Sequence, residues 1–406
     1  MNLFRRWRMK NQVKEISTDD PPEKIAAFFG LEEGTGEQLK SATYYACMQI
    51  RCNSIAKLPL KLMKRTGDSA RPARDHPLYN LVHSRPNPYM TWHDFIWATE
   101  YQKLTYGNAY WYPQYEKGKI KALYLLNSSD VTIIIDNLGV AETKNRVFYQ
   151  YVDPIAGILY FTGDELCHFK NFAGNGICGT AVSRYLSDII QNEQQANKVL
   201  KNKYRTGLQD PVIVQYMGDL SEEKQRKISK KFADLSGAKN AGKVIPIPPD
   251  YKVSQLETKL VNSQFFELQG LTTKHIANAF GVKSFQLNDL EKSTYANIEN
   301  QNRAYYSDTM MNNLTEYEQE ADYKLLTAKE QADYFFKFNV DAFLRSDPET
   351  RYKNYQIGIT SGFIMPSEVR GMEDLPFVEG TDRLIYGNGA AIPLDQVGIQ
   401  YQKGGE

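Results

Sequence analysis

Three glycines are the residues whose spacing most suggests chemistry. Gly174, Gly176 and Gly179 fit the G-x-G-x-x-G pattern of a dinucleotide-binding loop, and they lie between a strand-like run, ELCHFKNF, and a helical pattern. The sequence that follows does not complete such a site, because no strand–helix–strand unit is seen and Lys198 stands about 20 residues on, where an acidic residue would bind the ribose. The glycines therefore favour a flexible entry into a helix, and no cofactor is predicted.

No other motif indicates catalysis or metal binding. The sequence lacks a G-x-x-x-x-G-K-[ST] phosphate loop, an H-E-x-x-H metal motif and a G-x-S-x-G nucleophile motif. Its five histidines are scattered, and no cysteine or carboxylate spacing completes a metal set around them. The four cysteines form no C-x-x-C pair and are expected to be reduced thiols in the core; they are Cys47, Cys52, Cys167 and Cys178. The sequence thus predicts neither an enzyme nor a metalloprotein.

Composition indicates a folded protein with large contact surfaces. The 406 residues suffice for roughly two or three domains, and 27 Tyr and 19 Phe suit interfaces as well as cores. A net charge of +1 gives no global field that would mark a nucleic-acid binder. No run of about 18 apolar residues is present to span a membrane, and no apolar segment follows the basic start MNLFRRWRMK, so no signal peptide is predicted.

The N-terminal part has an α+β pattern. A helix is expected after Ser41, because Ala46, Ile50, Ile55 and Leu58 fall near helical spacing before Pro59, and a second is expected after Thr91 and ends at Gly107. Several β-type runs follow, separated by turns, and they predict a mostly antiparallel sheet; the runs are KLPLKLMKR, AYWYPQY, KALYLL, DVTIIID, VFYQYV and LYFTG.

The second half alternates long helices with a small insert. A helix over about 181–205 is followed by an insert with a strand at VIVQYM, a helix at 221–235 and a strand at GKVIPI, and a helix over about 257–280 returns. Alone, these helices would form an extended stalk with too little around it to bury it, so the pattern favours association with copies of the chain.

After a long loop, the sequence predicts a further helix over about 297–328. It is unusually polar, with ENQNR and EYEQEAD, and such faces suit packing between subunits or around water-filled space. A strand at YFFKFNV, a helix over about 348–361 and a short one at SEVRG complete the chain.

The helix of the insert is basic. Between residues 221 and 243, seven Lys or Arg residues stand against three acids, a net charge of +4. Such a run is usually a solvated face, but in a ring of copies it would become a strong annular field.

Six stretches in order give the chain a resemblance to the HK97-type portal proteins of tailed phages, from about Ser41 to Asp395. They are TYYACMQIRCNSIAKLPLKLMKR, HPLYNLVHSRPNPYMTWHDF with YGNAYWYP, GNGICGTAVSRYL, LSEEKQRKISKKFADLSGAKNAGKVIPI, HIANAFGV with DLEKSTYANIE, and ITSGFIMPSEVRGMEDLP. Two positions depart from the family: Lys283 stands where proline is usual, and Asn288 where glycine is usual. Asn tolerates a left-handed backbone, so the second change is mild.

The resemblance implies a portal-like subunit with named parts. They are a weakly ordered arm (1–38), an α+β wing (39–180), a first stem helix (181–207), a clip (208–256), a second stem helix (257–282), a tunnel loop (283–296), a long helix and return strand of the wing (297–345), and a crown-like helical region with the tail (346–406).

It also implies partners and functional residues. The expected assembly is a homo-oligomeric ring, typically of twelve subunits, at one capsid vertex of the virion, and in the host cytoplasm during assembly. Its expected partners are double-stranded DNA without sequence specificity, the terminase large subunit, major capsid and scaffold proteins, and a head–tail adaptor. The tunnel-loop candidates for DNA contact are Lys283, Gln286, Asn288 and Lys292. The clip candidates for docking the motor or adaptor are Lys224, Lys227, Lys230 and Lys231. The glycines at 174, 176 and 179 are expected to form a hinge of the stem.

Two alternatives stay open on the sequence. One is a monomeric nucleotide-binding enzyme that uses the glycine loop, and nucleotide-dependent thermal stabilisation would support it. The other is a nucleic-acid-binding module that uses the basic insert alone, and it should bind DNA as a monomer with a steep salt dependence.

Overall fold

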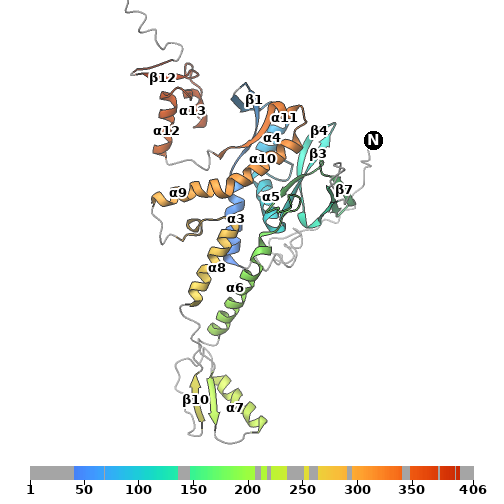
Figure 1. Ribbon diagram of the computed structural model, residues 1–406, viewed down its shortest axis with the longest axis vertical. Helices are drawn as coiled ribbons and strands as arrows, with labels where there is room; N and C mark the ends of the chain where they lie inside the picture. Colours follow the sequence, from blue (N-terminus) through green and yellow to red (C-terminus); the bar gives the residue numbers. More distant parts are fainter. Residues whose placement is uncertain are drawn as a thin grey trace, which may run out of the picture. The chain divides into compact units, whose positions relative to one another are not determined.

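The computed structural model describes residues 41–67, 69–135, 147–205, 212–216, 221–235, 251–255, 264–289, 295–340, 348–373, 375–388 and 390–393. The chain divides into two compact units, Met1–Phe338 and Asn339–Glu406. Both contain helices and strands, so the predicted mixed fold is confirmed (Figure 1). The expected N-terminal arm and the GKVIPI strand lie outside the described residues.

Two helices with local start signals form the centre of the first unit. Helix α3 (Ala42–Ala56) begins after Ser41, whose hydroxyl accepts the N–H of Tyr44 at 3.4 Å. Helix α5 (Trp92–Tyr106) begins with a capping box between Thr91 and Asp94 and ends at Gly107, whose φ is 83°. Of the four apolar residues whose spacing predicted this helix, Ile55 and Leu58 are buried, and Ala46 and Ile50 are half-buried. Its buried residues are Tyr44, Cys47, Met48, Arg51, Cys52, Ser54, Ile55 and Ala56.

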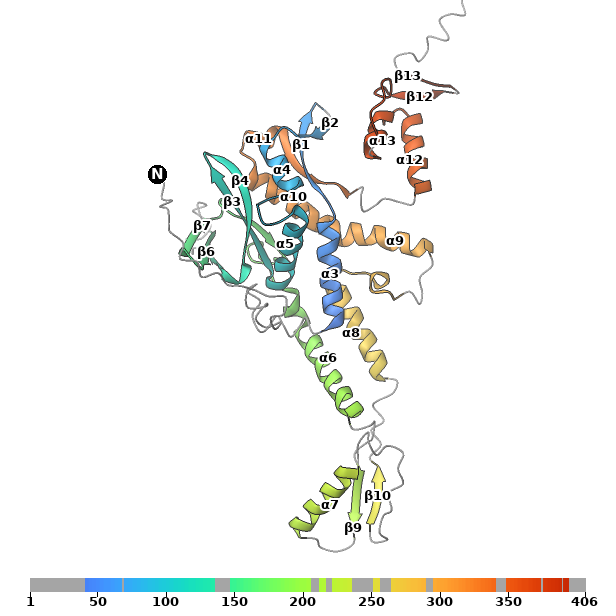
Figure 2. The same ribbon diagram turned by 180° about the vertical axis from the view of Figure 1, so that it is seen from behind.

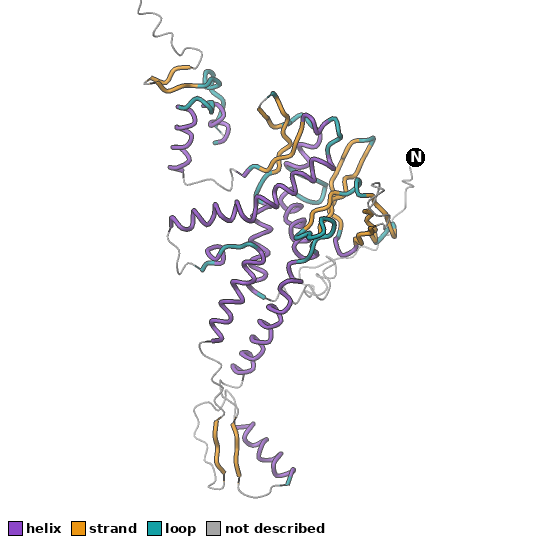
Figure 3. The backbone as a smooth tube through the Cα atoms, in the orientation of Figure 1, coloured by secondary structure: helices purple, strands orange, loops and turns teal. Residues whose placement is uncertain are grey.

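The predicted strands form three separate sheets rather than one. Their orders are β11-β1-β2, β4-β3-β8 and β5-β6-β7, and every strand pair among the described residues is antiparallel, as expected. Figure 3 shows the strands in orange among the purple helices. The strands are β1 (Leu60–Thr66), β2 (Ser69–Pro72), β3 (Asn108–Glu116), β4 (Lys119–Leu126), β5 (Val131–Ile135), β6 (Val147–Asp153), β7 (Gly157–Thr162), β8 (Cys167–Lys170) and β11 (Tyr334–Phe338). Helix α4 (Pro77–His83) was not predicted; it begins at His76, whose Nδ1 accepts the N–H of Leu78.

Two long helices pack beside α3. Helix α6 (Val182–Arg205) and helix α8 (Gln264–Phe280) lie next to each other, and α8 also contacts α3 (Figure 2). Their shared core includes Val182, Leu186 and Ile190 of α6, Ile276, Ala277 and Phe280 of α8, and Tyr44, Cys47 and Met48 of α3. The segment between α6 and α8 contains β9 (Val212–Tyr216), α7 (Glu222–Leu235) and β10 (Tyr251–Gln255), and β9 pairs with β10, a strand that was not predicted.

The predicted helix 297–328 is interrupted. It consists of α9 (Tyr295–Tyr305), a π-helical segment η4 (Tyr306–Met310) and α10 (Met311–Leu325), followed by the short α11 (Glu330–Asp333). Helix α10 contacts both β8 and β11, which belong to different sheets.

The second unit is small. It contains α12 (Pro348–Thr360), α13 (Pro366–Met372) and the hairpin of β12 (Ile385–Asn388) and β13 (Ala390–Pro393). Arg351 and Tyr355 of α12 both bond the carboxylate of Glu373, just after α13, at 3.0 Å.

Three of the four cysteines are core thiols, as expected. Cys47, Cys52 and Cys167 are buried, and burial raises the pKa of Cys47 to about 12. The prediction was wrong for Cys178, which is exposed in the loop before α6.

Among the residues described, none of the helices has the length and apolar character needed to cross a membrane.

Candidate functional site

The C-terminal end of α8 is held by two other elements. Arg51 of α3 donates from Nη1 to the carbonyl oxygen of Phe280 at 2.8 Å, and the Thr309 hydroxyl in η4 donates to the carbonyl oxygen of Gly281 at 2.9 Å. Gly281 has a φ of 67°, and a Cβ there would lie 2.6 Å from Thr309 Oγ1. Both the left-handed backbone and the close approach require glycine, so the chain leaves α8 in a fixed direction.

The predicted tunnel loop starts with an ordered turn. The 3-10 helix η3 (Ser284–Leu287) is stabilised by the N–H of Lys283, which donates to Gln286 Oε1 at 3.0 Å. Asn288 then takes a left-handed conformation, with φ 62° and ψ 20°, which confirms that asparagine tolerates this backbone here. Lys292 lies outside the described residues.

The first lysine of this loop has an acidic partner in η4. Lys283 Nζ lies 3.1 Å from Asp308 Oδ2, and the bond from Lys283, together with one from Ser307, lowers the pKa of Asp308. The structure therefore brings two of the four predicted residues, Lys283 and Gln286, into contacts within the subunit. Contact of this loop with DNA stays a prediction.

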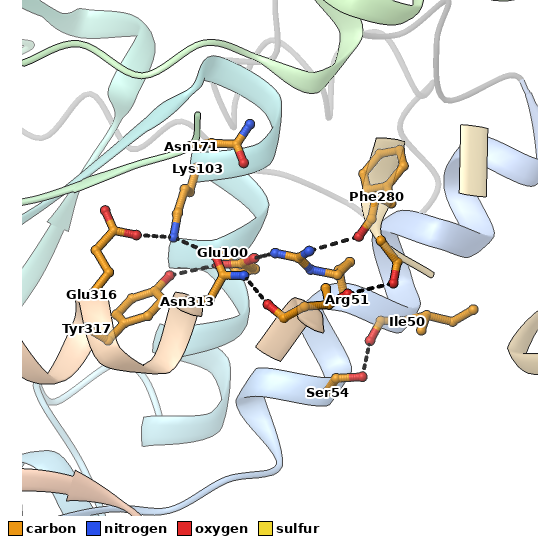
Figure 4. Close-up of polar contacts among 12 residues, drawn as sticks. Ile50, Arg51, Ser54, Glu100, Lys103, Asn171, Phe280, Asn313, Glu316 and Tyr317 are labelled. Carbon is orange, nitrogen blue, oxygen red and sulfur yellow. Dashed lines mark hydrogen bonds and ion pairs between the residues drawn. The ribbon is translucent and has the colours of Figure 1, made fainter. Parts of the chain in front are cut away.

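A buried ionic network lies next to the end of α8 (Figure 4). Arg51 Nη2 lies 2.9 Å from Glu100 Oε1, and the Tyr317 hydroxyl donates to Glu100 Oε2 at 3.0 Å. Glu100 of α5 is completely buried; burial alone would raise its pKa, but the charges of Lys103 and Arg51 outweigh burial and hold the pKa below its usual value. The carboxylate is therefore ionised at neutral pH and joins α3, α5 and α10.

Lys103 extends this network along α10. Its Nζ lies 2.6 Å from Glu316 Oε2 and 3.0 Å from Asn313 Oδ1, and it stands 4.9 Å from the centre of the Tyr317 ring. Because Arg51 also bonds Phe280, this connected set of side chains fixes the end of α8 relative to α5 and α10. This network was not predicted: Arg51 is the only charged residue of α3, and the i, i+3 spacing of Glu100 and Lys103 on α5 does not show that Arg51 and α10 supply their partners.

The acidic run EYEQEAD of α10 binds the edges of two sheets. Glu320 accepts the N–H of His168 at 2.8 Å and Glu316 accepts that of Lys170 at 2.6 Å, both on β8. Asp322 accepts the N–H of Phe336 at 2.6 Å and Glu318 that of Phe338 at 2.9 Å, both on β11. The expectation of packing between subunits or around water was wrong for these carboxylates, which satisfy strand N–H groups inside the subunit, and it stays a prediction for the ENQNR part in α9. The spacing of the two i, i+4 pairs was the signal in the sequence.

One of these carboxylates makes stability depend on pH. Burial raises the pKa of Asp322 from 3.8 to about 6, although the N–H of Phe336 acts in the opposite direction. Between pH 4 and 6 the folded chain therefore holds a proton that the unfolded chain has lost, and this group stabilises the fold increasingly as the pH falls from about 6 towards 4.

The variant Asp322→Asn should remove that dependence. Its amide oxygen can still accept the Phe336 N–H, so the contact is kept while the titration is lost. We expect the melting temperature of the wild type, relative to the variant, to increase as the pH is lowered from 7 to 4.5. A difference between the two proteins that stays constant over this range would contradict the assignment.

The glycine loop before α6 uses its own N–H groups internally. Asn175 Oδ1 accepts the N–H groups of residues 177 and 178, the carbonyl of residue 173 accepts that of Gly176, and the carbonyl of Asn171 accepts that of Thr180. The N–H of Gly179 donates to Asn108 Oδ1 at 2.8 Å. A phosphate-binding loop needs such groups free to point at the ligand, so this geometry argues against the nucleotide alternative.

Gly179 is also packed against the end of α5. A Cβ at Gly179 would lie 1.9 Å from the carbonyl oxygen of Gly107, whereas one at Gly174 would meet nothing within 4 Å. The Asn108 side chain links Gly179 to β8, because its Oδ1 accepts both the N–H of Gly179 and the Nε2–H of His168, the latter at 2.9 Å. Burial lowers the pKa of His168 to about 3, so the ring is neutral and its Nδ1 accepts the Tyr149 hydroxyl. A hinge at the three glycines stays a prediction, with Gly174 and Gly176 in open space and Gly179 anchored.

The basic helix α7 is exposed. Lys224, Lys227 and Lys230 all face solvent, and Lys227 pairs with Glu223 one turn earlier at 2.9 Å. The side chain of Lys231 lies outside the described residues. In the part of the chain that the structure describes, no group of His, Cys, Asp or Glu has the arrangement of a metal site.

Comparisons with known proteins agree along most of the chain. The family model described as "Phage portal protein" matches residues 42–374. The chain is 23% identical to the portal protein of Enterobacteria phage HK97 over 356 residues, which cover 85% of this chain and 81% of that protein. It is 25% identical over 294 residues to an uncharacterised protein of Rickettsia bellii, covering 69% of this chain and 73% of that protein.

Solved structures share the fold. A chain from the neck of an empty gene transfer agent particle, computed with C6 symmetry, has a TM-score of 0.57 at 20% identity and covers 84% of this chain and 92% of its own. An HK97-family phage portal protein from Corynebacterium diphtheriae has a TM-score of 0.54 at 13% identity, covering 77% of this chain and 98% of its own.

Proposed function

Because this chain belongs to the phage portal protein family, we propose that copies of it assemble into a closed ring that forms the DNA channel at one vertex of a capsid. DNA would enter through the ring during packaging and leave through it during ejection. The family is structural, and the similar neck assemblies are symmetric, with C6 or C12 symmetry, which supports a homo-oligomer of typically twelve subunits.

The observation that carries this proposal is the incomplete burial of α6 and α8. Within the subunit, α6 buries Val182, Leu186 and Ile190 near its start, but none of its described side chains after residue 190 is buried. Val199 of α6 and Leu271 of α8 are more than half exposed. Two helices with so little cover need neighbours, and copies of the same chain would supply them.

The tunnel loop would contact DNA through its backbone phosphates. A channel through which DNA moves should not bind it tightly, because each neutralised phosphate adds affinity that would act as drag. The near-neutral chain and the pairing of Lys283 with Asp308 both support weak contact of this kind. Contacts of Lys283, Gln286, Asn288 and Lys292 to phosphates would carry no sequence information.

The clip would dock the packaging motor and later the head–tail adaptor. The chain has no ATP-binding P-loop, so ATP hydrolysis would come from a separate terminase. The exposed lysines of α7 give that face a positive charge suited to an acidic partner surface or to incoming DNA. Charge reversal at Lys224 and Lys230 should therefore weaken capture of the terminase large subunit, and unchanged capture would remove these residues from the docking face.

The proposal is tested by the mass and shape of the purified protein. Light scattering and negative-stain microscopy should show rings with a central hole, at about twelve times the subunit mass of 46.5 kDa. A protein that stays monomeric even with capsid and scaffold proteins present would overturn the proposal.

A further inference from the structure

Two exposed aromatic rings meet where β8 leads into α6. The rings of Phe172 and Tyr185 are 5.3 Å apart between centroids and pack edge to face, yet the two residues are 70% and 57% exposed. Edge-to-face packing favours one relative orientation of the two rings. The pair is thus an apolar projection that the subunit itself leaves uncovered.

The backbone of Phe172 is strained. Its φ is 43°, a left-handed conformation that is unfavourable for a bulky residue. The neighbouring Asn171 imposes it, because its N–H donates to the carbonyl of Gly107, its carbonyl accepts the N–H of Thr180, and its side chain donates to the Thr180 carbonyl. Strain that no burial within the subunit offsets points to a contact made outside it.

One more exposed apolar side chain lies further along α6. Val199, 58% exposed, follows Tyr185 by 14 residues, about four helical turns, and so lies on nearly the same side of the helix. That side differs from the one that buries Val182, Leu186 and Ile190. Phe172, Tyr185 and Val199 are called the α6 strip below.

Two further exposed apolar side chains lie on the neighbouring helices, one on each. Leu271 of α8 is 51% exposed and Tyr45 of α3 is 49% exposed, and both lie outside the core that these helices share. Leu271 and Tyr45 are called the α8/α3 strip. A closed ring uses heterologous contacts, in which one patch of each subunit meets a different patch of the next.

We infer that the α6 strip of one subunit packs against the α8/α3 strip of the next copy, with Phe172 and Tyr185 as the main anchor. This inference rests on the proposed ring, because only a ring gives each subunit one neighbour for each strip. The aromatic pair has the composition of an interface hot spot, and the strain at Phe172 is offset when the ring is buried by the neighbour.

The strain makes the inference testable with one substitution. In Phe172→Gly the backbone conformation becomes favourable while the ring is lost, so the melting temperature of the dilute, unassembled subunit should stay equal or rise. Mass photometry should at the same time show the concentration needed for half-assembly increase at least tenfold, and further in Phe172→Gly/Tyr185→Ala. Tyr160→Ala, which removes a ring that is 65% exposed on β7, is the matched control and should assemble as the wild type does.

Mixing two variants tests which surfaces meet. Leu271→Asp should also prevent ring formation, but it keeps an intact α6 strip, whereas Phe172→Gly/Tyr185→Ala keeps an intact α8/α3 strip. Their mixture should therefore form one-to-one dimers and nothing larger, because only one intact interface is available.

The outcomes separate this inference from the proposed function. If the wild type forms rings and Phe172→Gly/Tyr185→Ala forms them at the same concentration, the inference is wrong and the ring stands. Rings in which footprinting leaves Phe172 and Tyr185 accessible overturn it too, and assign the pair to another partner. A wild type that forms no ring overturns the proposed function itself.

Discussion

Replacing Glu100 by glutamine is expected to destabilise the subunit by about 3–5 kcal/mol. The amide keeps the shape of the side chain, but it leaves the guanidinium of Arg51 buried without its counter-charge. Since a folded domain is stable by about 5–15 kcal/mol in total, much of the fold's stability would be lost. The measurement is the free energy of unfolding of the unassembled subunit in urea.

A surface pair provides the control for this prediction. Glu223→Gln removes the partner of Lys227 on α7, where both side chains are largely exposed, and should change stability by less than about 0.5 kcal/mol. Adding Arg51→Met to Glu100→Gln should recover part of the loss, because the uncompensated charge is then gone as well. Equal effects of Glu100→Gln and Glu223→Gln would show that the buried network does not hold the end of α8.

Gly179→Ala is expected to have an effect of similar size, about 3–5 kcal/mol. The new Cβ would lie 1.9 Å from the carbonyl oxygen of Gly107, so the backbone must move. That movement would break the bonds of Gly179 with Asn108 and disturb the buried contact of Asn108 with His168, and each buried polar group left unsatisfied costs about 1–3 kcal/mol. Urea unfolding of the unassembled subunit again measures the loss.

Gly174→Ala is the matched control in the same loop. A Cβ at Gly174 meets nothing within 4 Å, so the variant should lie within about 0.5 kcal/mol of the wild type or be slightly more stable. A nucleotide-binding loop predicts another result, in which nucleotide raises the melting temperature of the wild type and either substitution abolishes the shift. Such a shift of the melting temperature would support the nucleotide-binding alternative instead of the proposed function.

Features with local signals were predicted well from the sequence. Ser41 and Thr91 allowed the starts of α3 and α5 to be predicted, because a capping side chain accepts hydrogen bonds from N–H groups only a few residues away. Asn288 could be predicted to take a left-handed conformation for the same reason, since that preference belongs to the residue itself. The six ordered stretches of family resemblance added the overall assignment, which the family model confirms over residues 42–374.

Features that depend on distant partners were not predicted. The polarity of α10 suggested a solvent-facing or subunit-facing helix, because the i, i+4 spacing in EYEQEAD indicates two acidic faces but does not identify the strand edges that they bind. Cys178 was expected in the core but is exposed, because the burial of a cysteine depends on which other residues cover its loop. Gly179 was expected to be part of a flexible hinge, although its requirement for glycine comes from Gly107, 72 positions earlier in the chain. In each case a non-local contact decides the role.

The carboxylates of α10 also affect how the chain avoids aggregation. Strands β8 and β11 each lie at the edge of a sheet. Unpaired N–H groups at such an edge could otherwise form hydrogen bonds with a strand of another molecule. Glu316, Glu320, Glu318 and Asp322 occupy those groups with side chains from a helix, which cannot extend a sheet. At these two edges, newly made subunits are therefore protected from edge-to-edge β-pairing while they accumulate, so that helical surfaces can direct their association.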